Sequence, residues 1–143
     1  AGRLGVYKTE LDDLFAKSDF VTLHAPSIPQ TYHMIGERQL KLLRDGAVLI
    51  NTSRGSVIDH DALYAEAQTG RILVALDVTD PEPLPPDNPL RKLPNVIITP
   101  HISGAGFYGY YMIGSTTLQA LEDFFAGKPV DGAVDFSKFA LLA

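Results

Sequence analysis

Three residues with chemically useful side chains, Arg54, Glu82 and His101, stand in turn-forming contexts along the chain. Arg54 precedes a glycine, and its guanidinium suits the capture of a carboxylate by two parallel hydrogen bonds. Glu82 lies between two prolines, which restrict its backbone. His101 follows a proline, and a histidine paired with a carboxylate keeps its proton near neutral pH and serves as a general acid or base. Together these residue types indicate proton transfer on a substrate that carries a carboxylate.

Each of these residues also has a structural interpretation that the sequence leaves open. Arg54 is alternatively a loop arginine that holds a neighbouring acid, Glu82 a solvated loop acid, and His101 a capping or packing histidine. Asp77 either hydrogen-bonds a ligand amide or caps the turn that follows it. The spacing of the other histidines does not match a helical metal pair, so we expect no metal site and structural roles for them. They are His24, His33 and His60.

Length and composition restrict the class of protein. The 143 residues are 45% hydrophobic and 20% charged, with a mean hydropathy of +0.05, which is typical of one folded domain. The formal net charge is -5 and no basic stretch occurs, which argues against nucleic acid as a partner. Cysteine is absent, which excludes disulfides and thiolate chemistry. The longest aliphatic run, residues 72–76, is too short to span a membrane, and no signal segment opens the chain. We therefore expect a cytoplasmic protein with no membrane partner.

Hydrophobic patterning predicts strands and helices in alternation. Strands are expected at residues 20–24, 47–50, 72–77 and 96–99, which are short apolar runs bounded by turn residues. Helices are expected at residues 37–44, from a cap at Asp59 to Gly70, and at 108–126. The pattern of residues 1–19 is ambiguous, with a short helix at 10–16 as one interpretation. Six of the ten prolines lie between residues 79 and 94 and predict an extended, non-helical path there. Continuous apolar strands separated by helices predict an α/β fold, with a parallel sheet covered by helices on both faces.

Polar or special residues follow each predicted strand. The second strand leads into Arg54 and the fourth into His101. The third leads into Asp77 and the loop that contains Glu82. Because ligands of open parallel sheets bind beyond the carboxyl ends of the strands, we expect these side chains to collect at one edge of the sheet.

Four stretches of the sequence resemble the D-isomer-specific 2-hydroxyacid dehydrogenases, in order and at the spacing of that family. They are residues 18–26 (SDFVTLHAP), 49–59 (LINTSRG and then VID), 75–85 (ALDV and then EPLP) and 94–104 (PNV and then TPHISG). The likeness extends over about residues 10–130. It implies a Rossmann-type fold, with the chain as the second half of a doubly wound NAD-binding domain.

By this resemblance, Arg54 binds the substrate carboxylate, His101 donates and accepts the proton, and Glu82 is the carboxylate partner of His101. The family likeness also implies an NAD(P)-dependent oxidoreductase of a small 2-keto or 2-hydroxy acid. NAD is the implied cofactor with NADP as its alternative. We also expect a homo-oligomer, namely a dimer. Residues implied along the cofactor are Ala25, Pro26, Thr52, Ser53, Arg54, Asp77, His101 and Gly104. A dinucleotide-binding corepressor, or another non-catalytic interaction module of the same fold, is the alternative function.

Departures from the family pattern shape our expectations for this chain. We expect residues 1–127 to be a partial NAD-binding domain that lacks the Gly-x-Gly-x-x-Gly unit. Residues 128–143 are expected to be a carboxyl-terminal remnant of the segment that closes toward a substrate domain. The usual Thr-x-Glu at the start of the last helix is replaced by residues 107–110 (FYGY). A chain with these departures is expected to be inactive by itself and to self-associate through the unpaired edge of its first strand.

Overall fold

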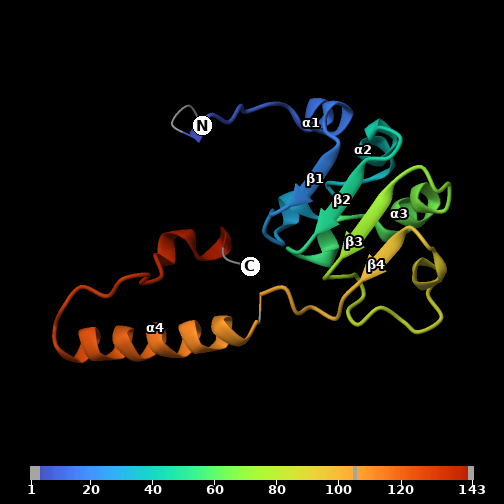
Figure 1. Ribbon diagram of the computed structural model, residues 1–143. Helices are drawn as coiled ribbons and strands as arrows, with labels where there is room; N and C mark the ends of the chain where they lie inside the picture. Colours follow the sequence, from blue (N-terminus) through green and yellow to red (C-terminus); the bar gives the residue numbers. More distant parts are fainter. Residues whose placement is uncertain (1–3, 105, 142–143) are drawn as a thin grey trace. The chain divides into compact units, whose positions relative to one another are not determined.

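The computed structural model describes residues 4–104 and 106–141 (Figure 1). The chain forms two compact units, Ala1–Pro100 and His101–Ala143. The predicted division of the family domain at residue 127 stays a prediction. In the described part of the chain, no helix is both long and apolar enough to cross a membrane.

The first unit is built on a four-stranded sheet with the strand order β1-β2-β3-β4, and each strand runs parallel to its neighbours. The strands are β1 (Phe20–Leu23), β2 (Val48–Asn51), β3 (Leu73–Leu76) and β4 (Val96–Ile98). All four predicted strands are confirmed to within about one residue at each end. The predicted α/β fold with a parallel sheet is therefore confirmed.

Three α-helices belong to this unit: α1 (Leu11–Lys17), α2 (Glu37–Leu42) and α3 (His60–Ala67). Asp59 caps α3 as predicted, because its carboxylate accepts from the backbone N–H groups of Asp61 and Ala62 at 3.0 and 3.1 Å. Gly70 follows α3 with a φ of +73°, the left-handed conformation that glycine favours after a helix. Along the sheet, α1 packs beside α2 and α2 beside α3.

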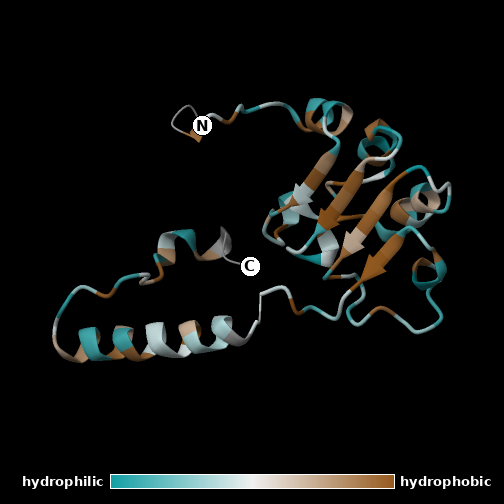
Figure 2. Ribbon diagram, viewed as in Figure 1, coloured by the Kyte–Doolittle hydropathy of each residue, from teal (hydrophilic) through white to brown (hydrophobic). Residues whose placement is uncertain are grey.

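Within the first unit these helices cover one face of the sheet (Figure 1), and the prediction of helices on both faces stays a prediction. Sequential parallel strands joined by right-handed crossovers place their connecting helices on the same side. Val21, Leu49 and Val74 are accordingly buried, whereas Phe20 and Leu73 on the opposite face are 73% and 49% exposed. Figure 2 shows that the strands are mostly hydrophobic along their length. The uncovered face is therefore apolar as well.

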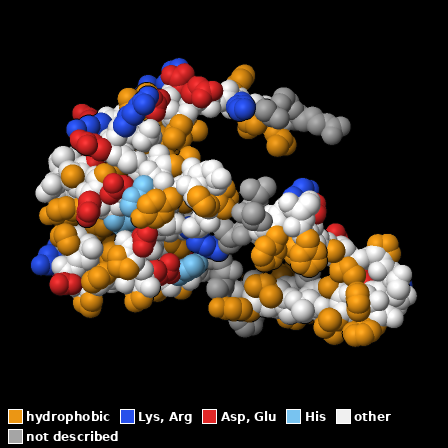
Figure 3. All heavy atoms as spheres, turned by 180° about the vertical axis from the view of Figure 1, so that it is seen from behind, with side chains coloured by type: hydrophobic (Ala, Val, Ile, Leu, Met, Phe, Trp, Pro, Cys, Tyr) orange, Lys and Arg blue, Asp and Glu red, His pale blue; other side chains and the backbone are white. Residues whose placement is uncertain are grey.

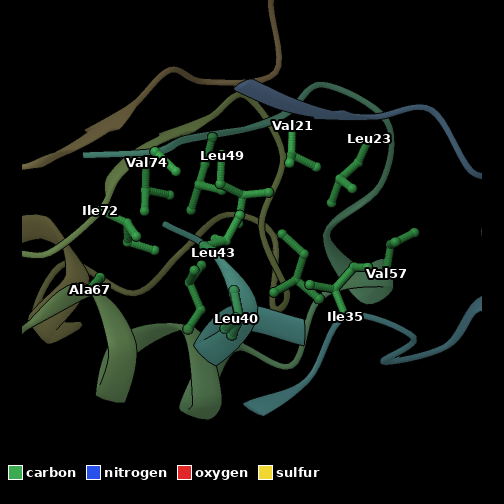
Figure 4. Packing of buried hydrophobic residues seen from close by; sticks show 14 of the residues in the cluster. Val21, Leu23, Ile35, Leu40, Leu43, Leu49, Val57, Ala67, Ile72 and Val74 are labelled. Atoms are coloured by element: carbon green, nitrogen blue, oxygen red, sulfur yellow. The ribbon is translucent and has the colours of Figure 1, made fainter. Parts of the chain in front are cut away.

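The core of the first unit lies between the sheet and the helices (Figure 4). Side chains of the strands, such as Leu49 and Val74, point toward Leu40 of α2 and Ala67 of α3. The largest fully buried side chains are Phe15, Ile35, Leu40, Leu43, Leu49, Ile58, Leu63, Ile72, Leu76, Leu90, Val21 and Val57. Each such side chain contributes about 1.5–3 kcal/mol relative to exposure, so this core stabilises the packing of the helices on the sheet.

The proline-rich segment between residues 79 and 94 contains one turn of 3-10 helix, Pro89–Lys92. The prediction of a wholly non-helical path is wrong at this turn. Proline occupies its first position, where no N–H is needed, and Asn88 caps it by accepting from the Leu90 N–H at 3.0 Å. Two further 3-10 turns of the first unit are Pro29–Thr31 and Gly55–Val57.

The second unit consists of α4 (Phe107–Phe125) followed by a 3-10 helix, Phe136–Leu141. The helix predicted at residues 108–126 is thus confirmed, and Gly127 follows it with a φ of +68°. Among residues 101–141, no side chain that the structure describes is buried. Figure 3 shows hydrophobic side chains gathered over this unit. Taken by itself, the described part of the second unit therefore has no hydrophobic core beneath α4.

Candidate active site

The four strands end in one row across the sheet. Their last residues, Leu23, Asn51, Leu76 and Ile98, are partners in register. The loops after the strands therefore leave the sheet at the same edge, as in the ligand sites of parallel sheets. The predicted site residues of the first unit lie on these loops: Ala25, Pro26, Thr52, Ser53, Arg54, Asp77 and Glu82.

Asn51, the last residue of β2, shapes the turn that carries Arg54. Its side chain is fully buried and its amide donates to the Arg54 carbonyl oxygen at 2.9 Å. Its side-chain oxygen accepts from the Ser53 N–H at 3.0 Å and from the Ser53 hydroxyl at 2.9 Å. A buried amide that makes all these bonds favours one loop conformation over others. Arg54 itself is exposed at the edge of the sheet, and its guanidinium donates to the Ser53 carbonyl oxygen at 2.8 Å.

Gly55 brings the Arg54 turn against the loop that follows β3. A Cβ atom on Gly55 would lie 2.1 Å from the carbonyl carbon and oxygen of Thr79 and 2.6 Å from the backbone nitrogen of Asp80. Only glycine permits two backbone segments to approach this closely. The contact therefore fixes the Arg54 turn to the beginning of the loop that carries Glu82.

The loop around Glu82 is held on both sides. Before it, the Thr79 hydroxyl donates to the Pro81 carbonyl oxygen at 2.9 Å. After it, Leu84 is buried and its carbonyl oxygen accepts from the Arg91 guanidinium at 2.6 Å. Glu82 is exposed between these two anchors. The backbone at Glu82 is thus restrained by hydrogen bonds in addition to the flanking prolines that the sequence shows.

Asp77 is buried directly after β3. Its carboxylate accepts from the Thr99 hydroxyl at 2.5 Å, and its N–H donates to the Asn51 carbonyl oxygen at 2.9 Å. These bonds tie together the segments that follow β2, β3 and β4. Both predicted roles of Asp77, toward a ligand amide and as the cap of the turn that follows it, stay predictions.

The segment after β1 is shaped by Thr31. The Thr31 hydroxyl donates to the Pro26 carbonyl oxygen and accepts from the Ile28 N–H at 3.1 Å. Ala25 packs against the core, whereas Pro26 is exposed. Pro26 therefore lies at the surface of the sheet edge, where a cofactor contact is predicted.

His101 and Gly104 belong to the second unit. His101 has a φ of +52°, a left-handed conformation that is uncommon for a residue with a side chain. Residues held in such conformations cluster at functional sites. The roles of His101 and Gly104 in catalysis and cofactor binding stay predictions.

The glycine spacing that we expected the chain to lack is present near the start of α4. Gly104, Gly106 and Gly109 stand at the spacing Gly-x-Gly-x-x-Gly, so that expectation is wrong. The Gly106 carbonyl oxygen accepts from the Gly109 N–H at 2.7 Å, and a Cβ atom on Gly109 would lie 3.1 Å from the Gly104 oxygen. The dinucleotide fingerprint follows the first strand of a βαβ unit, whereas these glycines follow β4.

His60, which was expected to be structural, contacts the Glu82 loop. The Asp80 N–H donates to its Nε2 at 3.3 Å, and its Nδ1 lies 3.1 Å from the Ile58 carbonyl oxygen. Burial is the largest influence on the imidazole and lowers the pKa of His60 below its usual value. The ring is therefore neutral at physiological pH.

Sequence analysis missed three residues that shape the candidate site: Asn51, Gly55 and His60. Gly55 and His60 act through Thr79 and Asp80, which lie on a loop distant in sequence, so only the tertiary structure shows these contacts. For Asn51 a signal existed, because asparagine after a strand favours a turn closed by its own side chain.

Two hollows of about 330 and 480 Å³ lie in the second unit, along α4 and residues 130–132. Neither is lined by a residue predicted to bind substrate or cofactor. The candidate site of the first unit is an edge formed by loops.

The sequence matches the family model described as D-isomer specific 2-hydroxyacid dehydrogenase, NAD binding domain, over residues 1–103. A glyoxylate reductase from Korarchaeum cryptofilum is 52% identical over 103 residues, which are 71% of this chain and 31% of that protein. A glyoxylate/hydroxypyruvate reductase B from Yersinia enterocolitica is 41% identical over 134 residues, which are 93% of this chain and 41% of that protein. The chain thus spans less than half the length of these relatives.

Solved structures agree with this relationship. A D-isomer specific 2-hydroxyacid dehydrogenase from Xanthobacter autotrophicus Py2, in complex with NADPH and MES, has a TM-score of 0.75 at 33% identity, covering 87% of this chain and 51% of its own. A related protein from Polaromonas sp. has a TM-score of 0.82 at 30% identity, covering 91% of this chain and 41% of its own. The chain therefore belongs to the D-isomer specific 2-hydroxyacid dehydrogenases, and its residues 1–103 belong to the NAD-binding domain of that family.

Proposed function

We propose that the protein containing this chain is an NAD(P)-dependent oxidoreductase that interconverts a small 2-keto acid and the D-2-hydroxy acid. One observation carries the proposal. Gly55 joins the Arg54 turn to the loop of Glu82 at the carboxyl edge of the parallel sheet. The contact joins the two segments that carry Arg54, proposed to bind the substrate carboxylate, and Glu82, proposed as the carboxylate partner of His101. The relatives are named as reductases and a dehydrogenase, which favours an enzyme over a non-catalytic module.

Each residue of the proposed site has one task. Arg54 binds the carboxylate of the substrate, because a guanidinium matches its two oxygens. His101 gives a proton to the substrate oxygen during reduction and takes it back during oxidation. Glu82 stabilises the protonated form of His101 by its charge. A bound nicotinamide supplies or accepts the hydride.

The residues at the sheet edge fit a dinucleotide. Pro26 and Thr52 are exposed there, and the backbone around them is shaped by the Thr31 and Asn51 bonds. Ala25, Ser53 and Asp77 line the same edge, and Gly104 is proposed to complete the cofactor site. We propose NAD as the cofactor with NADP as the alternative.

The test is reduction of glyoxylate and hydroxypyruvate by the whole protein with NADH and, separately, with NADPH. We expect Arg54→Met to raise KM for the acid strongly, and His101→Asn to lower kcat by roughly two to four orders of magnitude. The same substitutions at Arg44 and His24 serve as matched controls. Arg44 pairs with Asp19 at 3.0 Å, and the His24 ring bonds to the Thr22 hydroxyl at 3.0 Å. A His101→Asn enzyme with the wild-type rate rejects the assignment.

We further propose that the 143-residue chain alone lacks turnover and self-associates along β1, whose outer edge has no strand partner in the described sheet. A homo-oligomer, namely a dimer, and a cytoplasmic location stay predictions for the whole protein. Light scattering during a titration with NADH tests both proposals for the chain. Micromolar NADH binding with keto-acid turnover by a monomer rejects them, and it would direct attention to the turn of Gly104, Gly106 and Gly109.

A further inference from the structure

His60 lies where the first turn of α3 meets the loop that carries Glu82. It is the first residue of α3 and directly follows the capping Asp59. Its ring reaches the backbone of Asp80, two residues before Glu82, where the Asp80 N–H donates to Nε2 at 3.3 Å. A single side chain thus links a helix of the folded core to the loop that carries Glu82, the proposed carboxylate partner of His101.

The hydrogen bonds define which nitrogen of the ring carries the proton. The Asp80 N–H is a donor, so Nε2 accepts and is unprotonated. Nδ1 lies 3.1 Å from the Ile58 carbonyl oxygen, which only accepts, so Nδ1 carries the hydrogen. The neutral ring satisfies both neighbours. A doubly protonated ring would turn its Nε2–H toward the N–H of Asp80 and break that bond.

The charged neighbours of His60 act in both directions. The carboxylates of Asp80 and Asp59 favour the protonated ring, and His33 from the turn after Pro29–Thr31 disfavours it. Burial outweighs these charges and lowers the pKa. The neutral acceptor form is therefore the resting form of the ring.

We propose that His60 is a positioning residue, which as a neutral imidazole holds the Asp80 amide and thereby the loop that presents Glu82. This inference rests on the function proposed for Glu82. The Thr79 hydroxyl, the Arg91 guanidinium on the Leu84 carbonyl and the close approach of Gly55 restrain the same loop. His60 is thus one of four anchors. Acidification removes this anchor and leaves the other three.

The first measurement follows the amide of Asp80 by NMR in the 143-residue chain as pH is changed. We expect its shift to move with the ring signals of His60, at one shared midpoint below the usual 6.5. His24 is the control, because it is exposed and its ring bonds to the Thr22 hydroxyl at 3.0 Å. In a His24→Gln variant, the Asp80 amide is expected to respond to pH as it does in the wild type. An Asp80 amide shift that stays constant while His60 titrates overturns the proposal.

The second measurement compares variants in the whole enzyme. His60→Leu removes the acceptor and is expected to lower kcat about tenfold with KM within about twofold, because the loop is displaced. His60→Gln keeps an acceptor oxygen near the position of Nε2 and is expected to restore most of the rate without the pH dependence. If the leucine variant does not fold, the glutamine variant carries the test through its flattened pH profile.

A double substitution separates positioning from a general loss of structure. In a Glu82→Gln background, His60→Leu is expected to cause no further loss of kcat, because it acts through Glu82. Independent, multiplying losses overturn the proposal. A Glu82→Gln enzyme with the wild-type rate instead overturns the proposed function of Glu82, while the NMR titration still decides whether His60 anchors the loop.

Discussion

The two units of the chain place their apolar side chains in opposite environments. In the first unit, Leu49 is completely buried between the sheet and the helices. In the second unit, Leu121 and Phe124 on α4 are 51% and 67% exposed, and no described side chain is buried. Both units have regular secondary structure with high apolar content. Secondary structure and burial are therefore separate properties in this molecule.

The difference shows what stabilises each unit. Strands and helices of the first unit are held by a shared core, whose burial free energy offsets the cost of ordering the chain. The helix α4 depends on its own backbone hydrogen bonds, and helices in water gain most of their stability from packing an apolar face. Substitutions of the same kind should therefore have different effects in the two units.

The largest contrast is expected for leucine-to-alanine substitutions. Leu49→Ala leaves a cavity in the core and is expected to lower the free energy of unfolding of the first unit by about 2–5 kcal/mol. Leu121→Ala in α4 removes a half-exposed side chain, and the free energy of unfolding is expected to change by less than about 0.5 kcal/mol. Urea unfolding followed by circular dichroism measures both. Equal losses would show that α4 is buried in solution.

Glycine-to-alanine substitutions are expected to change stability in opposite directions in the two units. Gly55→Ala forces a methyl group into the backbone of Thr79 and Asp80 and is expected to cost about 1–3 kcal/mol in unfolding free energy. Gly114→Ala places a methyl group in open space on α4 and is expected to favour the helix by about 1 kcal/mol. Thermal unfolding reports the first, and amide exchange along α4 reports the second. A Gly55→Ala chain as stable as the wild type would contradict the close approach.

The loss of stability on breaking an ion pair is expected to differ less between the two units. The Arg71 guanidinium donates to the Glu66 carboxylate at 2.9 and 2.5 Å and to the Leu40 carbonyl oxygen at 3.2 Å. Glu66 is buried, so Arg71→Met leaves its carboxylate without its cation. The substitution is expected to lower the free energy of unfolding by about 1–3 kcal/mol. Lys138→Met breaks the exposed pair with Asp135 and is expected to have no measurable effect. Equal losses of unfolding free energy in the two variants, measured by urea unfolding, would contradict this expectation.

The smallest expected contrast concerns pH. The lowered pKa of His60 means that the unfolded chain binds the proton more readily. Its contribution to the stability of the first unit is therefore present above about pH 6.5 and is lost as pH falls through the lowered pKa. Hydrogen bonds from Ser137 lower the pKa of Asp135, so the corresponding contribution in the second unit is lost only in acid, below 3.8.

Unfolding at a series of pH values checks this order. The decline as pH falls below about 6.5 is expected to disappear in His60→Gln and to persist in a His24→Gln control. A decline that both variants retain would assign it to another group.

Much of the fold was predictable because it depends on residues close together in sequence. The apolar runs at β1 to β4, the Asp59 cap and the glycine after α4 act within one or two turns of the chain, and all were predicted correctly. What covers each face of the sheet depends on segments that are distant in sequence. Nothing local distinguishes a buried strand residue such as Val21 from an exposed apolar one such as Phe20.

For the candidate site, residue types and order along the chain predicted that Arg54, Asp77 and Glu82 follow strands that end at one edge. This succeeds because parallel strands bring all their carboxyl ends to the same side. Which loops touch was decided by the tertiary structure alone: Gly55 against Thr79, and His60 beneath Asp80. Such contacts depend on the relative heights of neighbouring strands and on helix placement, both of which are set by packing of the whole core and by no local pattern.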